Sequence, residues 1–139
     1  MLERGDRDFR TTAEVVAELA DARARGFDVV TLTGGEPTIR KDLPALVKAA
    51  TSLGLAVGLQ TNGRMLAYPE VREGLQGLSI RFVIALHGPD AFVHDAVTRA
   101  PGSFEQTLEG IRALAAAGEK ITLKILMSRI NADRLEDLA

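Results

Sequence analysis

Residues Val29 to Pro37 read Val-Val-Thr-Leu-Thr-Gly-Gly-Glu-Pro. The short apolar run that opens this stretch predicts a buried strand. Glycine permits positive φ and close backbone approach, and proline fixes φ after the carboxylate. We therefore expect a turn at the end of a strand whose free N–H groups hold an anion while Glu36 holds an ammonium. A glycine-rich turn with a solvated glutamate is the alternative.

Helix and strand patterns alternate on both sides of this stretch. Strands are predicted over residues 27–32, 55–60, 79–86 and 121–127. Helices are predicted to start at two capping boxes (Thr11 with Glu14, Ser103 with Gln106), at the caps Asp42 and Asn131, and near Pro69. Strands joined by helices imply a parallel sheet with right-handed crossovers, so the fold class is α/β.

Composition excludes several classes of function. The chain has 139 residues, a net charge of −2 and 4% aromatic residues with no Trp, which argues against nucleic acid and anionic membranes as partners. It has no cysteine, hence no disulfide, thiolate metal site or cysteine nucleophile. No segment reaches the ~18 apolar residues of a membrane span. The charged residues 1–8 do not form a signal peptide, so we expect a cytoplasmic protein.

Turn and polar residues follow all four predicted strands. They are the segments 34–37, 61–63, 87–89 and 128–129. In parallel α/β folds ligands bind outside the carboxyl ends of the strands. Each segment is explained either as a turn or as part of a ligand site, and both interpretations stay open at this point.

Other polar residues have two explanations each. Asn62 either permits a left-handed turn or donates its amide to a ligand. His87 is a base or a capping residue, and His94 with Asp95 is a base with its orienting carboxylate or a helix-start pair in the long connection 88–102. The two histidines are seven residues apart, which does not favour a metal site. Lys124 lies at an edge, faces outward or points into a barrel lumen.

Taken together, these segments resemble the core domain of the radical S-adenosylmethionine (radical SAM) superfamily. Residues 26–43 resemble that family's second strand and its Gly-Gly-Glu-Pro loop, residues 60–63 its third strand end, and residues 85–104 its fourth strand and following loop. The resemblance implies a partial (β/α) barrel of about four parallel βα units. Residues 1–139 would be the central portion, without the first strand, its cluster loop and the last units.

The resemblance also implies a cofactor and its contacts. Family members hold a 4Fe-4S cluster on three cysteines and reductively cleave S-adenosylmethionine to a 5′-deoxyadenosyl radical. Ala85 stands where the family usually has a polar residue, often Ser, and Arg99 would pair with the methionine carboxylate. The expected cofactor-binding residues are Gly34, Gly35, Glu36, Pro37, Thr61, Asn62, Ala85 and Arg99. No catalytic or metal-binding residue is expected in this chain.

The absence of cysteine leads to three functional hypotheses. We expect a fragment of a radical SAM enzyme core that is inactive alone, since its thiolates are absent. The alternatives are a free-standing, cluster-less scaffold that binds a nucleoside or a protein, and an unrelated α/β enzyme using Glu36 and His87 for acid–base work. An incomplete barrel exposes strand edges, which predicts self-association. The sequence does not identify a substrate.

Overall fold

A computed structural model of the chain describes residues 10–138. Its one sheet contains four parallel strands in the order β1-β2-β3-β4. Their bounds are β1 (Val29–Leu32), β2 (Ala56–Thr61), β3 (Ile80–Ala85) and β4 (Lys120–Lys124). The predicted α/β class is confirmed. The two outer strands, β1 and β4, pair on one side only within the described residues.

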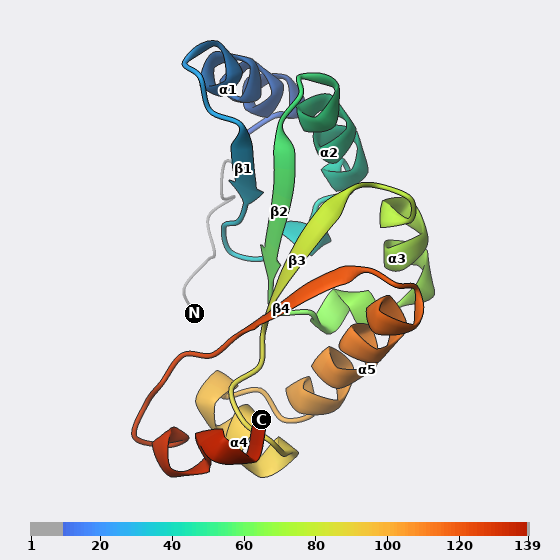
Figure 1. The fold of residues 1–139 in the computed structure, drawn as a ribbon. Helices are drawn as coiled ribbons and strands as arrows, with labels where there is room; N and C mark the ends of the chain where they lie inside the picture. Colours follow the sequence, from blue (N-terminus) through green and yellow to red (C-terminus); the bar gives the residue numbers. More distant parts are fainter. Residues whose placement is uncertain (1–9, 139) are drawn as a thin grey trace, which may run out of the picture.

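Helices cover one side of this sheet (Figure 1). The α-helices are α1 (Thr12–Ala24), α2 (Leu43–Ser52), α3 (Pro69–Leu75), α4 (Ala91–Thr98) and α5 (Ser103–Ala116), and the 3₁₀ helices are η1 (Pro37–Ile39), η2 (Arg64–Ala67) and η3 (Ala132–Leu138). Apolar residues of α2 and α5 pack on strand residues such as Leu59, Phe82 and Ile84 to form the core. The helices and the alternating burial pattern of β3 thus define one buried face of the sheet.

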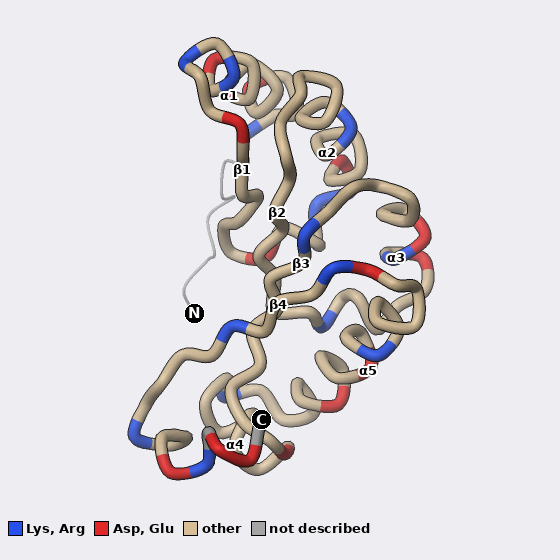
Figure 2. The backbone as a smooth tube through the Cα atoms, viewed as in Figure 1, with Lys and Arg blue, Asp and Glu red and all other residues tan. Residues whose placement is uncertain are grey.

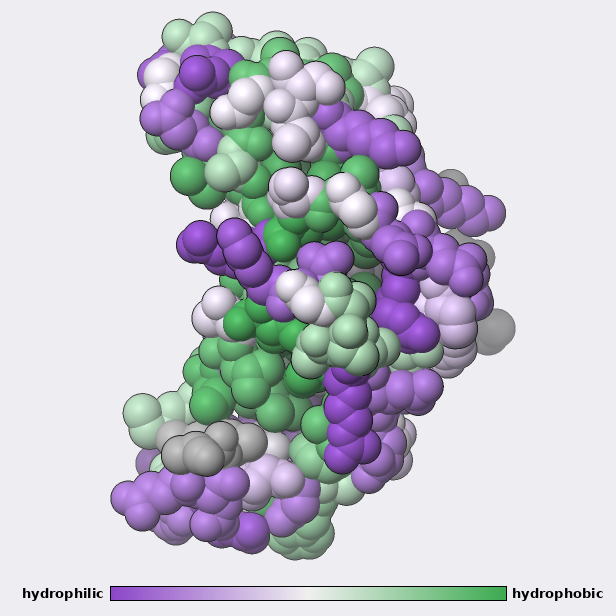
Figure 3. Space-filling model, turned by 45° about the vertical axis from the view of Figure 1, so that its right-hand side comes forward, coloured by the Kyte–Doolittle hydropathy of each residue, from purple (hydrophilic) through white to green (hydrophobic). Residues whose placement is uncertain are grey.

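The opposite face of the sheet is open within residues 10–138 (Figure 1), and we call it the open face. In β3 the buried Ile80, Phe82 and Ile84 alternate with Arg81, Val83 and Ala85, which must point to the other side. Lys124 is the register partner of Ala85 on β4 and is exposed, so it lies on the open face at the end of an edge strand. Figure 2 shows basic residues on β3 and β4 and none on β2. Figure 3 shows hydrophobic surface gathered in the hollowed side of the molecule.

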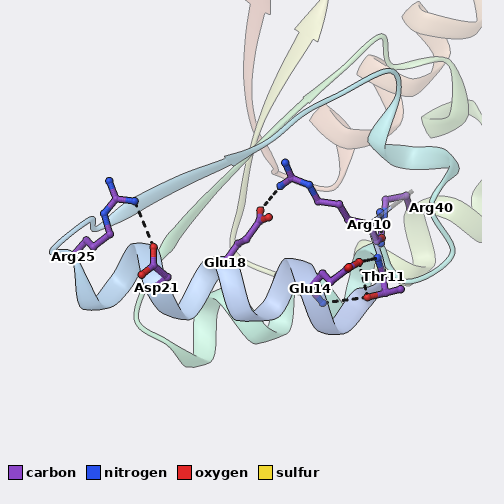
Figure 4. A network of polar contacts seen from close by, with 7 residues as sticks. All are labelled: Arg10, Thr11, Glu14, Glu18, Asp21, Arg25 and Arg40. Carbon is purple, nitrogen blue, oxygen red and sulfur yellow. Dashed lines mark hydrogen bonds and ion pairs between the residues drawn. The ribbon is translucent and has the colours of Figure 1, made fainter. Parts of the chain in front are cut away.

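The start of α1 follows the predicted capping box (Figure 4). The Thr11 hydroxyl accepts the N–H of Glu14 at 3.2 Å, and the Thr11 N–H donates to the Glu14 carboxylate at 2.7 Å. That backbone hydrogen bond is the main reason that the pKa of Glu14 is lowered. The exposed pairs Arg10–Glu18 and Arg25–Asp21 in the same view add little stability, because water screens them.

Two other predicted caps lack the expected capping hydrogen bond, although Asp42 does occupy the N-cap position of α2. Asp42 lies at the start of α2 but makes no capping hydrogen bond; Arg40 Nη2 donates to its carboxylate at 2.6 Å. The Arg40 guanidinium, with the Thr12 hydroxyl, lowers the pKa of Asp42 to about 2. Ser103 does not cap α5, whose N-cap is Gly102, because its hydroxyl bonds to Asp95 instead. In both cases a charged partner from outside the helix end takes the side chain.

The long connection between β3 and α5 contains helix α4, which starts at Ala91, three residues before the helix-start pair suggested for His94 and Asp95. Asp90 caps α4 by accepting the N–H of Val93 at 2.9 Å. Strand β4 is shorter than predicted and ends at Lys124, where β3 ends opposite it. The apolar residues Ile125, Leu126 and Met127 beyond it are 40%, 63% and 69% exposed. Residues 10–138 contain no helix with the length and apolarity needed to cross a membrane.

Candidate functional site

The candidate site lies at the carboxyl ends of the four strands. Because the strands are parallel and hydrogen-bonded in sequence order, Gly34, Asn62 and His87 follow neighbouring strands at the same edge of the sheet. Helix α4 lies below this edge in Figure 1. The structure thus brings together three of the four segments that the sequence marked as polar, while residues 128–129 lie farther along the chain because β4 already ends at Lys124.

Gly34 and Gly35 leave open space beside the end of β1. Gly34 has φ +143°, a conformation that favours glycine, and both residues are exposed. Within residues 10–138, a Cβ at either position would meet no atom beyond its chain neighbours within 4 Å. A ligand can therefore approach the backbone of both residues closely.

The Glu36 carboxylate is held by the chain itself. One oxygen, Oε1, accepts the Thr38 N–H at 3.1 Å and the hydroxyls of Thr38 and Thr61 at 2.5 Å each. The other, Oε2, accepts the Asn62 N–H at 2.8 Å. Glu36 thus ties the end of β1 to the end of β2, a positioning role in addition to the ammonium contact expected from the sequence. Sequence reasoning missed Thr38, although a hydroxyl two residues after a capping carboxylate is a usable signal.

Pro37 and Thr61 are buried parts of the same turn. Pro37 is the first residue of η1, where its fixed φ suits a helix start and its missing N–H costs nothing. Thr61 is 3% exposed, and its hydroxyl accepts the Gly63 N–H at 3.0 Å while it donates to Glu36. Both residues support the turn, and neither presents its side chain to solvent.

Asn62 makes the turn after β2. Its Oδ1 accepts the N–H of Arg64 at 3.0 Å, and Gly63 follows with φ +79°. Its backbone carbonyl accepts the Thr107 hydroxyl at 3.0 Å, which ties the turn to α5. The turn explanation of Asn62 therefore holds for its oxygen. The side chain remains exposed.

His87 and His94 lie together beyond β3. The N–H of His87 donates to His94 Nδ1 at 3.0 Å, and the two rings stack with centroids 5.6 Å apart. His87 Nδ1 in turn accepts the Leu126 N–H at 3.2 Å. Burial lowers the pKa of both rings, and the nearby His87 lowers that of His94 further. Both imidazoles are therefore neutral acceptors that hold the segments after β3 and β4.

Asp95 does not orient His94, so the base-and-carboxylate interpretation of that pair is wrong. His94 is 1% exposed inside α4, and Asp95 instead accepts the N–H groups of Gly102 and Phe104 at 2.6 and 2.8 Å. Burial raises the pKa of Asp95, but these hydrogen bonds and the Ser103 hydroxyl outweigh it, so the pKa lies below the usual value. Asp95 fixes the start of α5.

Asn131 is a further positioning residue, and it does not cap η3 as predicted. It is fully buried; its Nδ2 donates to the carbonyls of His87 and Leu126 at 2.8 and 2.9 Å, and its Oδ1 accepts the Ser128 N–H at 2.7 Å. It therefore joins the segments after β3 and β4. Its partners are up to 44 residues away in the chain, so no local pattern indicates this role.

Ala85 and Arg99 border the same region. Ala85 ends β3 and lines a cavity of ≈ 140 Å³ together with Asn62, Arg64, His87, His94 and Thr98. Arg99 ends α4 with φ +56°, the one non-glycine residue with positive φ in the described chain, and is exposed. It adjoins the cavity between its lining neighbours Thr98 and Ala100 but does not line it.

The family model described as the Radical SAM superfamily matches residues 2–139. The chain belongs to this superfamily. It is 35% identical over 117 residues to an AdoMet-dependent heme synthase of Oleidesulfovibrio alaskensis, covering 81% of this chain and 29% of that protein. It is 34% identical over 137 residues to mycofactocin maturase MftC of Mycobacterium tuberculosis, covering 97% and 34%.

Solved structures show the same fold. The crystal structure of Streptococcus suis SuiB bound to precursor peptide SuiA superimposes with a TM-score of 0.83 at 19% identity, covering 99% of this chain and 31% of that one. SuiB bound to S-adenosylmethionine gives a TM-score of 0.79. The radical SAM chain described here spans about a third of the length of the relatives it matches.

The residues of this radical SAM chain do not fit an iron–sulfur cluster. The chain has no cysteine, and residues 10–138 contain no group of three His, Asp or Glu side chains placed to hold a metal ion. The site does fit an amino acid or nucleoside ligand, because the backbone at Gly34 and Gly35 is open and polar groups line the neighbouring cavity.

Proposed function

We propose that residues 1–139 form the S-adenosylmethionine-binding central portion of a radical SAM enzyme core, and that this portion is inactive alone. The observation that carries the proposal is the open double glycine at the same sheet edge as Asn62 and the cavity beside Ala85, in a chain of this superfamily. S-adenosylmethionine, when bound to a complete core with a 4Fe-4S cluster, supplies a 5′-deoxyadenosyl radical.

The chain's own residues would bind and orient this cofactor. The exposed backbone of Gly34 and Gly35 would contact the methionine amino group, and the fixed negative charge of Glu36 lies next to it. Pro37 and Thr61 would hold that turn in shape. The remaining part of S-adenosylmethionine would be contacted from the ends of β2, β3 and α4 by Asn62, Ala85 and Arg99.

The cluster requires ligands from outside this chain. The chain has no thiolate that could bind the iron of such a cluster. We expect the natural reading frame upstream of Met1 to encode the cysteine loop. An upstream frame without three such cysteines would favour the cluster-less scaffold instead.

Calorimetric titration of the purified chain with S-adenosylmethionine tests the binding role. Gly35→Val adds a side chain where the described part of the chain has no atom within 4 Å of the new Cβ, so the variant should fold and still obstruct the ligand. We expect an affinity loss of about tenfold or more, equivalent to ~1.4 kcal/mol. Ala45→Val on the exposed side of α2 is the matched control and should bind as the parent does. Equal affinities of both variants, or no heat from the parent chain, would reject the proposal.

We also propose that the chain self-associates through its edge strands. β1 and β4 each leave one row of backbone groups unpaired within the described residues, and Leu126 and Met127 beyond β4 are more than half exposed. Sedimentation velocity over a concentration series should show dimers or larger species. A chain that stays monomeric at millimolar concentration would refute this.

A further inference from the structure

The cavity beside the end of β3 lies between the turn after β2, the end of β3 and the helices α4 and α5. Asn62 and Arg64 come from the end of β2 and η2, Ala85 and His87 from β3 and the residues after it, and His94 and Thr98 from α4. Its volume is ≈ 140 Å³. The polar atoms that open on this cavity determine what it can bind.

His87 and His94 both line the cavity, and each ring carries its proton on Nε2. The Nδ1 atoms of His94 and His87 accept the backbone N–H groups of His87 and Leu126, so the ring proton of each neutral imidazole is on Nε2. His94 is 1% exposed, and its Nε2 makes no hydrogen bond within residues 10–138. No fully enclosed side-chain nitrogen or oxygen of those residues lacks a partner. His94 Nε2–H is therefore open to the cavity that its ring lines.

Arg64 supplies a fixed positive charge. Its Nε donates to Gln106 Oε1 at 2.7 Å, and Gln106 contacts the Tyr68 hydroxyl at 3.5 Å. The half-buried guanidinium is thereby oriented by α5, while its two terminal amino groups make no hydrogen bond within the described residues. A guanidinium held in this way is suited to bidentate contact with a planar anion.

The neighbouring carboxylates do not neutralise this charge. No Asp or Glu lines the cavity. Asp90 accepts from Arg134 and the Val93 N–H, Asp95 accepts from the start of α5, and Glu36 accepts four hydrogen bonds at the end of β2. The cavity therefore combines one cation with several uncharged donors and has no anion of its own.

We propose that this cavity is a carboxylate-binding site in which the guanidinium of Arg64 and the Nε2–H groups of His87 and His94 hold the anion. The inference rests on the proposed function for its place beside the cofactor, and it assigns to Arg64 the anion contact that the sequence suggested for Arg99. Two sources share this chemistry: the amino-acid carboxylate of S-adenosylmethionine and a carboxylate of the substrate.

Imidazole NMR of the isotopically labelled full chain tests the site with acetate at pH 7.5. Acetate should shift the Nε2 signals of His87 and His94 in a saturable way, and neutral acetamide should not. Arg64→Gln should weaken acetate binding about tenfold, since it removes a charge-assisted bidentate contact. Arg64→Lys should restore part of the affinity. Arg112→Gln, which removes an exposed arginine of α5, is the matched control and should change nothing.

Two further ligands identify the source of the carboxylate. S-adenosylmethionine binding that weakens on decarboxylation of the ligand, in an Arg64-dependent way, assigns the site to the cofactor. Equal binding of both forms, with acetate still bound through Arg64, assigns it to the substrate. Acetate binding without any S-adenosylmethionine binding upholds the site and rejects the proposed function.

Two results would overturn the carboxylate site. If S-adenosylmethionine binds but acetate shifts neither imidazole, or if Arg64→Gln and Arg112→Gln bind acetate equally, the carboxylate site is wrong while the proposed function stands. Thermal unfolding of each variant confirms that it folds, so a loss of binding is not mistaken for a loss of structure.

Discussion

Two clamps hold the strand ends of this domain, and they use opposite chemistry. At β1 and β2 the clamp is an anion, Glu36, which collects four donors from η1 and the end of β2. At β3 and β4 it consists of neutral groups, the two stacked imidazoles and the amide of Asn131. The Glu36 carboxylate accepts hydrogen bonds from residues of η1 and the end of β2 and leaves the backbone of Gly34 and Gly35 free to contact a ligand. The imidazoles accept backbone N–H groups at Nδ1 and leave their own Nε2–H groups free to donate. Each clamp thus determines which polar groups remain for a ligand.

Removing the anionic clamp should have the largest effect. Glu36→Ala leaves the hydroxyls of the buried Thr38 and Thr61 and the Asn62 N–H without their acceptor. Orphaned donors cost ~1–3 kcal/mol each when buried, so we expect a loss of about 3 kcal/mol in the free energy of unfolding. Urea denaturation measures it, with Glu109→Ala on the exposed side of α5 as control. A loss equal to that of the control would show that the clamp does not support the strand ends.

A close backbone contact between α5 and the turn after β2 should have the next largest effect. A Cβ at Gly110 of α5 would lie 2.7 Å from the Gly63 carbonyl and 2.9 Å from Leu66 Cβ. Gly110→Ala should therefore destabilise by ~1–3 kcal/mol despite its better helix propensity. Gly74→Ala in α3 is the matched control, since its Cβ would meet only Pro44 Cγ at 3.4 Å, and it should stabilise by up to about 1 kcal/mol. Equal thermal shifts for the two variants would contradict the close approach of α5 and η2.

The two clamps also differ in how far the sequence predicts them. The positions of the strands follow from local apolar runs, their parallel arrangement follows from the helices that join them, and the Thr11 cap follows from spacing alone. Asp42 and Ser103 have the spacing of helix caps, but their side chains bond to the charged residues Arg40 and Asp95 instead of the helix backbone. Asn131 bonds to His87, 44 residues away. Polar side chains select among partners that only the tertiary fold brings together, so sequence locates the candidate site but does not assign its hydrogen bonds.

The neutral clamp should weaken in mild acid. Burial lowers the folded-state pKa of His87 and His94, so the unfolded chain binds protons first as pH falls. The stabilisation is complete above the unfolded value near ~6.5 and is lost as pH drops through the lowered folded values. Urea midpoints between pH 7.5 and 5 should decline. His94→Asn, whose Oδ1 can accept the His87 N–H without titrating, should decline less steeply. If the urea midpoint of His94→Asn falls with pH as steeply as that of the parent chain, His94 is not the source of the pH sensitivity.

The smallest effect is expected at Arg99, which adjoins the neutral clamp. Its φ of +56° is unfavourable for a side chain with a Cβ, so Arg99→Gly should raise the unfolding free energy by up to about 1 kcal/mol. Arg99→Ala keeps the strained backbone and removes only the guanidinium, so it should leave stability nearly unchanged. Comparing S-adenosylmethionine affinity in the two variants separates the roles. If the side chain contacts the cofactor, both variants bind more weakly; if only Arg64 provides the cation, both bind as the parent does. A strained arginine whose removal costs neither affinity nor stability would have no role at this edge of the sheet.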